Sequence, residues 1–214
     1  MKFRHLMLAI ALGAAVAGCS SIERSRNLAN PNVSSTALAQ QVCSNCHGID
    51  GRAANPNFPN LAAQQTVYFI AQMKAFRSHD RLDPAGFEYM WGLSRSLTDK
   101  QISGLADYYA AQAPAAPSRA GDAAAIARGR IVFGQGVAEK NIPACSTCHG
   151  PQAEGNGQFP RLAHQHADYI VKQLNVFQRT DERPEGAIMK PIAHDLTPQN
   201  MQDVASYLQE LSAK

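Results

Sequence analysis

The sequence predicts an all-α protein built as two copies of one helical unit. A six-residue motif occurs twice, and each copy is followed by apolar side chains at helical spacing. No stretch shows the alternation of apolar and polar residues that is typical of half-buried strands. We expect the units at residues 35–113 and 122–214, joined by the Pro- and Ala-rich linker 114–121.

The repeated motif is the attachment pattern of c-type haem. Its copies are Cys43-Ser44-Asn45-Cys46-His47-Gly48 and Cys145-Ser146-Thr147-Cys148-His149-Gly150. Two thiols at this spacing can bond to the two vinyl groups of one porphyrin, and the adjacent histidine can bind the iron. A zinc site would need two further ligands near each pair, and a redox disulfide needs neither the histidine nor a second copy. The motifs therefore predict two covalently bound haem c groups.

The start of the chain has the pattern of an export signal. Lys2 and Arg4 precede an apolar run at residues 6–17, which is too short to span a bilayer. Residues 16–19, Val-Ala-Gly-Cys, resemble a bacterial lipobox, in which the cysteine is acylated and becomes the N-terminus. Cys19 is the one cysteine of five outside the haem motifs. A free thiol would be a liability in an oxidising compartment, which favours acylation.

These patterns predict a signal peptide at residues 1–18 and a flexible tether at residues 19–34 that begins at lipidated Cys19. A soluble periplasmic protein cut after Ala17 is the alternative. Removal of the signal lowers Lys plus Arg from 20 to 18, against 17 Asp plus Glu. No basic stripe remains, so nucleic-acid binding has no support. We expect a periplasmic protein that is held at a membrane by its lipid.

Each unit is expected to repeat one order of elements. A helix leads into the first cysteine, at residues 36–43 with Ser34 or Ser35 as its cap, and at residues 122–133 in the second unit. The motif, a Phe-Pro-x-Leu loop and an amphipathic helix follow, at residues 68–76 and 169–177. A last helix starts at a capping threonine, Thr98 in the first unit and Thr197 in the second.

Alignment of the two units selects the second iron ligand. Met90 lies opposite Met189, and both precede a Leu-Thr pair by seven residues in the loop before the last helix. Met73 and Met201 lie opposite apolar residues on helix faces, so we expect them in the core. No histidine outside the motifs recurs, and we expect solvated surface positions for His79, His164, His166 and His194. His/Met ligation of both irons follows, and the thioether ligand raises the reduction potential.

The paired motifs, Phe-Pro-x-Leu loops, methionines and closing helices resemble the dihaem cytochrome c4 family, over residues 35–214. The resemblance implies two tandem class I cytochrome c domains that transfer electrons between a quinol-oxidising membrane complex and a terminal haem-copper oxidase. It also implies that the carbonyl groups of Pro59 and Pro160 accept hydrogen bonds from His47 and His149. Gly129 and Phe133 resemble the family's pair at the crossing of the terminal helices, and the first unit shows no such pair.

We therefore expect an electron carrier without enzymatic activity or a small-molecule substrate. The alternative is the haem-bearing subunit of a periplasmic dehydrogenase, because such a subunit can use the same fold. A dihaem peroxidase would need an open iron, and the matched methionines argue against it. The expected partners are membrane redox complexes or a dehydrogenase subunit.

Overall fold

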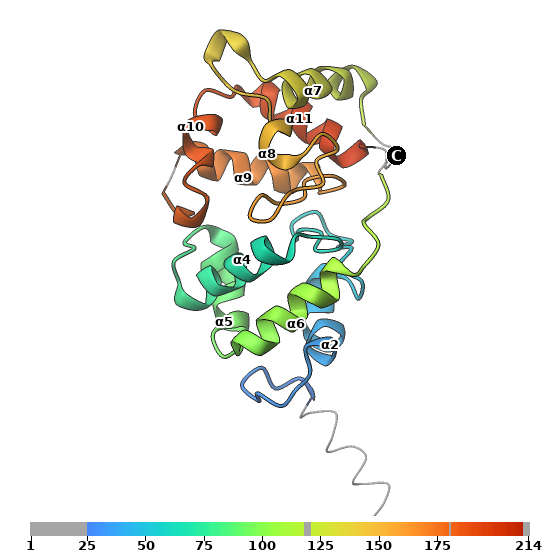
Figure 1. Cartoon of the computed structure of the whole chain (residues 1–214), viewed down its shortest axis with the longest axis vertical. Coiled ribbons are helices and arrows are strands. Elements are labelled where there is room, and N and C mark those ends of the chain that lie inside the picture. Colours follow the sequence, from blue (N-terminus) through green and yellow to red (C-terminus); the bar gives the residue numbers. More distant parts are fainter. Residues whose placement is uncertain (1–24, 118–120, 180, 212–214) are drawn as a thin grey trace, which may run out of the picture.

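The computed structural model describes residues 25–117, 121–179 and 181–211. Within these ranges the chain is helical, and β-structure is limited to isolated bridges between Val137 and Ile142 and between Asn156 and Phe159. The all-α prediction is confirmed. Figure 1 shows two helical units stacked along the long axis, and we call them the first unit (α2 to α6) and the second unit (α7 to α11).

The two units use similar elements in the same order. The first unit contains α2 (Ser35–Leu38), the π-helical turn η1 (Ala39–Cys43), α3 (Ser44–His47), α4 (Thr66–Ser78), the π-helical turn η2 (Gly86–Met90), α5 (Trp91–Ser94) and α6 (Asp99–Ala110). The second unit contains α7 (Ala123–Gln135), the 3₁₀ turn η3 (Ala138–Lys140), α8 (Ser146–His149), α9 (Ala167–Arg179), the 3₁₀ turn η4 (Pro184–Gly186), α10 (Met189–Ala193) and α11 (Pro198–Glu210).

Four of the described helices begin where a local side chain accepts from a free N–H group of the first turn. Ser34 caps α2, and Asp122 caps α7. Thr98 Oγ1 accepts from the Gln101 N–H at 3.2 Å, while Gln101 Oε1 accepts from the Thr98 N–H at 3.0 Å. This capping box fixes the start of α6, and Thr197 forms a similar box at the start of α11.

Each unit has its own apolar core. In the first unit, Ile102 and Tyr109 of α6 pack with Phe69 of α4. In the second unit, Leu208 of α11 packs with Ile170 of α9. The apolar stripes that the sequence assigns to these helices are therefore buried. Met73 and Met201 are also buried in these cores, as expected.

The first and last helices of each unit cross closely at a glycine. This glycine lies on the first helix in the second unit and on the last helix in the first unit. In the second unit, a Cβ atom on Gly129 of α7 would strike the backbone carbonyl of Asp203 in α11, and Phe133 is buried beside this crossing. In the first unit the glycine is Gly104 of the last helix, and it faces the side chain of Ser35 in α2. The missing glycine of the first entrance helix is thus replaced on the opposite side of the contact.

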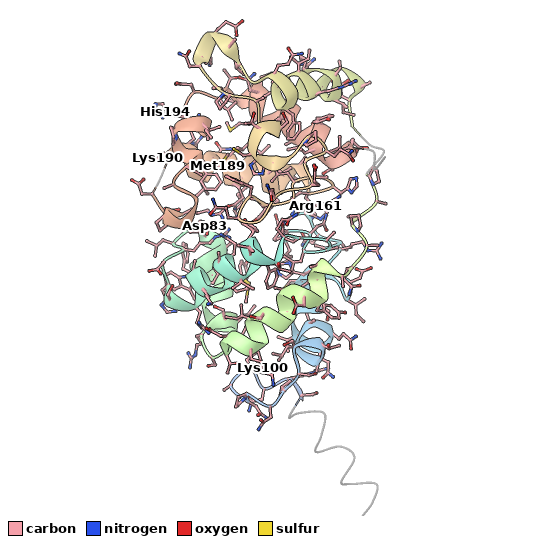
Figure 2. All side chains as sticks on the ribbon, viewed as in Figure 1. Asp83, Lys100, Arg161, Met189, Lys190 and His194 are labelled. Carbon is pink, nitrogen blue, oxygen red and sulfur yellow. The ribbon has the colours of Figure 1, made fainter. Side chains whose placement is uncertain are left out.

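The boundary between the units is a reciprocal set of hydrogen bonds. Gln165 accepts from the Asn60 N–H at 2.8 Å and donates to the Asn60 carbonyl at 2.9 Å. Gln64 makes the matching pair with Arg161, at 2.8 and 3.1 Å. Figure 2 shows Arg161 near this boundary. The two units are therefore joined through backbone groups as well as through the linker.

A buried polar cluster lies at the same boundary, where Asp83 is seen in Figure 2. Arg81 binds Asp83 at 2.7 Å and Gln72 at 2.6 Å within the first unit, and it reaches Gln173 of the second unit at 3.3 Å. Arg183 of the second unit binds Gln173 at 2.6 Å and Gln72 at 2.7 Å. Each glutamine oxygen thus accepts from one arginine of each unit.

Candidate functional site

Each haem-attachment motif is folded as one short helix with a glycine stop. Cys43 is the N-cap residue of α3, and Cys46 lies three residues later within this helix. Their side chains therefore lie on the same side of the turn. His47 ends the helix and is buried. Gly48 follows with φ 76°, where a Cβ atom would strike the Arg52 carbonyl, which explains why glycine is needed. Gly150 has the same role after α8, with φ 81°.

The histidine of each motif is oriented by a proline carbonyl. His47 Nδ1 lies 2.9 Å from the Pro59 oxygen, and His149 Nδ1 lies 2.9 Å from the Pro160 oxygen. Burial lowers the pKa of both imidazoles, and the hydrogen bond to the carbonyl offsets this only in part. A neutral ring that donates from Nδ1 has its lone pair on Nε2, which is the form that binds a metal.

An apolar cavity in the first unit joins the first motif to its matched methionine. It is lined by Leu28, Leu38, Val42, Cys43, Met73, Met90, Leu93, Leu97 and Leu105. Apolar walls with one motif cysteine and two thioethers, Met73 and Met90, fit the face of a porphyrin, which needs a water-poor pocket and a soft axial donor.

The same surroundings do not fit zinc. Burial raises the pKa of the Cys43 and Cys145 thiols to about 11, so both are protonated thiols when nothing is bound to them. Among the residues that the structure describes, no group of three or more His, Cys, Asp or Glu side chains could hold a metal ion. The donor set therefore matches haem.

The matched methionines lie in short helical segments, where the sequence predicted loops. Met90 is the last residue of η2, and Met189 is the first residue of α10. Ser94 donates to the Met90 carbonyl at 2.7 Å. Trp91 donates from Nε1 to the Arg81 carbonyl at 2.9 Å, so the segment that carries Met90 is fixed on both sides. Figure 2 shows Met189 near Lys190 and His194 in the second unit.

The prediction of a solvated surface position is wrong for His164, which is buried, and holds only in part for His166, which is partly buried. His164 is buried, with its Nε2 close to the Leu211 carbonyl, and His166 lies 2.9 Å from the Ala53 carbonyl of the other unit. His79 and His194 are exposed, as expected.

The sequence-based reasoning also missed Gln64 and Gln165. Their side chains accept from the N–H groups of Arg161 and Asn60, the residues that follow each proline. The available signal was their recurrence at equivalent positions of the two units, two residues before α4 and α9.

Two haem-attachment helices with oriented histidines define a c-type cytochrome with two haems. The sequence profile of the family described as cytochrome c matches residues 35–111 and 126–212. The chain is 41% identical to cytochrome c-552 of Acidithiobacillus ferridurans, over 79% of this chain and 73% of that protein. It is 35% identical to cytochrome c4 of Azotobacter vinelandii, over 79% and 84%. The chain belongs to the dihaem cytochrome c4 family, and it is an electron-transfer protein with two covalent haem c groups.

Solved structures give the same fold. Cytochrome c4 of Acidithiobacillus ferrooxidans has a TM-score of 0.73 and 42% identity, and the match covers 79% of this chain and 98% of that one. A thiosulfate dehydrogenase of Marichromatium purpuratum has a TM-score of 0.67 and 30% identity, over 88% of this chain and 40% of that one. A protein named thiosulfate dehydrogenase electron acceptor, from Stutzerimonas stutzeri, is 35% identical over 82% of each chain. The prediction of two tandem cytochrome c domains is confirmed.

The predicted lipid anchor at Cys19 lies outside the residues that the structure describes. Residues 1–24, which include the predicted signal peptide, Cys19 and the first part of the predicted tether, are not among the described residues. None of the helices in the described ranges has the length and apolar character that crossing a bilayer requires.

Proposed function

We propose that this protein is a membrane-anchored periplasmic electron carrier. It takes electrons from a quinol-oxidising complex or a dehydrogenase and passes them towards a terminal haem-copper oxidase. The observation that supports this best is the matched pair of sites, each with a buried histidine oriented by a proline carbonyl and a methionine at an equivalent position. The proposed axial ligands are His47 and Met90 for the first iron and His149 and Met189 for the second. The proposed thioether bonds are made by Cys43, Cys46, Cys145 and Cys148.

This ligation suits a carrier for two reasons. A histidine and a methionine fill both axial positions, which leaves no position for a substrate. The thioether also raises the reduction potential relative to a second imidazole, so reduced protein can donate to an oxidase. We further propose that the two domains extend over residues 35–113 and 122–214.

The second candidate function is that of the electron acceptor of a periplasmic dehydrogenase. It is favoured by the relative named as the electron acceptor of thiosulfate dehydrogenase and by the thiosulfate dehydrogenase whose structure contains a similar pair of domains. The two functions differ in the electron donor, since the same closed sites serve both.

The test uses the full-length dihaem protein in detergent. We expect membranes that contain the terminal oxidase to oxidise the reduced protein in a cyanide-sensitive reaction. We also expect a quinol-oxidising complex to reduce it again. Reduction by thiosulfate with thiosulfate dehydrogenase, without delivery to the oxidase, would favour the second function. Peroxide turnover by the pure protein would show an open iron and contradict both.

The ligands are tested by Met90→His and Met189→His. Each change should lower the potential of one haem and remove its share of the Met-to-iron charge-transfer band. Met73→Leu is the matched control, because Met73 borders the same cavity as Met90 but belongs to the core. Loss of the band in Met73→Leu, with the band retained in Met90→His, would contradict the assignment.

The anchor is tested by Cys19→Ala. Two or more acyl chains contribute about 0.8 kcal/mol per buried CH₂ group and hold a protein stably on a membrane. The variant should appear in the soluble fraction with an unchanged haem spectrum. Wild-type protein that is wholly soluble and begins at Gly18 would instead show cleavage after Ala17.

A further inference from the structure

We infer that Gln64 and Gln165 position the iron-binding histidine of the opposite unit, so that each haem site depends on a side chain from the other half of the chain. This inference rests on the proposed function, in which His47 and His149 are iron ligands.

The geometry in the first unit passes through a single peptide group. The Pro59 carbonyl accepts from His47 Nδ1 at 2.9 Å, and the N–H of the same peptide, which belongs to Asn60, donates to Gln165 Oε1 at 2.8 Å. Because a peptide group is planar and rigid, fixing its N–H also fixes the direction of its carbonyl. Gln165 therefore sets the orientation of the group that orients His47.

The second unit repeats this arrangement with the roles of the units exchanged. His149 Nδ1 lies 2.9 Å from the Pro160 carbonyl, and the N–H of that peptide, from Arg161, donates to Gln64 Oε1 at 2.8 Å. A second bond from each glutamine amide to the next carbonyl prevents the amide from rotating away.

Both glutamine side chains are shielded from water, with Gln64 8% exposed and Gln165 6% exposed. In a water-poor setting a hydrogen bond at the N–H of a peptide also polarises its carbonyl and makes it a better acceptor. A stronger acceptor makes the imidazole a more basic ligand, which favours ferric iron. Loss of the glutamine bond should therefore raise the potential of the haem in the opposite unit.

The experiment changes one unit and measures the haem in the other. Gln165→Met is made in a Met189→His background, where the second haem titrates at a separate, lower potential. At the original midpoint potential, we expect the ferrous-to-ferric ratio of the first haem to rise by up to roughly fivefold, the factor for full loss of one ordinary hydrogen bond. The paramagnetically shifted methyl resonances of the first haem should also move, because they report the orientation of the axial imidazole. Gln64→Met in a Met90→His background should act in the same way on the second haem.

Gln178→Met is the matched control, because this glutamine lies on α9, the helix that follows Gln165, and donates to carbonyls of its own unit. It should leave the first haem unchanged. If Gln165→Met does not load haem, Gln165→Asn makes the same test. The asparagine side chain is one methylene shorter, so its amide oxygen does not reach the Asn60 N–H.

The results separate this inference from the proposed function. If Gln165→Met lowers thermal stability but leaves the potential and methyl resonances of the first haem unchanged, the glutamines only join the units and the inference is wrong. If Met189→His fails to lower a potential, the proposed methionine ligand is wrong. The methyl resonances then still decide the inference, because they report the histidine.

Discussion

Replacement of Arg81 by methionine should cost about 3 kcal/mol of unfolding free energy at neutral pH. Asp83 is fully buried, and Arg81 binds its two carboxylate oxygens at 2.7 and 3.2 Å. Removal of one partner from a buried ion pair costs about 3–5 kcal/mol, because the other charge stays buried. The lower end applies here, since Gln173 remains 3.4 Å from Asp83 and Arg183 adds a nearby positive charge.

This cost should depend on pH. Burial acts to raise the pKa of Asp83, but the Arg81 guanidinium, together with Arg183 and Gln173, more than offsets it and holds the pKa below its usual value. In the wild type, the lowered pKa of Asp83 contributes stability that is present above the unfolded-state pKa and is lost as pH falls through the folded-state pKa. In the variant, burial without the guanidinium should raise the pKa of Asp83. The difference between the two proteins should therefore shrink as pH falls from 7 towards about 4.

The assay is urea unfolding of the dihaem protein, followed by far-UV circular dichroism at both pH values. Arg95→Met is the matched control, because Arg95 is an exposed arginine of the same unit and should cost little. Adding Asp83→Leu to Arg81→Met should recover stability, since both charges are then gone. A loss below about 1 kcal/mol at pH 7, or a loss that is equal at both pH values, would refute the reasoning.

Three further substitutions test local features. Gly129→Ala should destabilise the second unit by about 1–3 kcal/mol in thermal unfolding, because the new methyl group meets the Asp203 carbonyl; an unchanged melting temperature would exclude the close crossing. Thr98→Ala should cost about 1 kcal/mol through loss of the capping box, and Thr98→Ser should keep most of it. Trp91→Phe removes one hydrogen bond beside Met90, the proposed ligand of the first iron, so added imidazole should displace that methionine roughly fivefold more readily; equal imidazole titrations would contradict this.

Short-range patterns account for most of what the sequence predicted. The haem motifs, the capping box at Thr98 and the apolar stripes each depend on residues within a few turns of one another. The repeat added a comparison between the units, which paired Met90 with Met189. The segments around these methionines were predicted as loops because they are short and lack an apolar period. In the Met90 segment, the bond from Ser94 to the Met90 carbonyl and the bond from Trp91 to the Arg81 carbonyl support the helical turns.

These short-range patterns could not predict the contacts between the two units. Gln64 and Gln165 have the appearance of ordinary polar residues before a helix, and their partners lie about a hundred positions away in sequence. His164 was assigned to the surface for the same reason, because its burial depends on the last helix of its unit and on Asn60 of the other unit. The recurrence of a glutamine at equivalent positions of both units was the sequence feature that indicated a role for Gln64 and Gln165.

The reciprocity of the boundary bears on the origin of the chain. A contact in which equivalent residues exchange equivalent bonds is the isologous kind that two identical protomers form about a twofold axis. Gene duplication of a symmetric homodimer, followed by fusion through a short segment such as residues 114–121, would yield this architecture without a new contact. Fusion then frees each half to diverge, as Trp91 and its counterpart Lys190 have done. It also makes an association that depended on concentration permanent, so the two haems stay paired at any dilution.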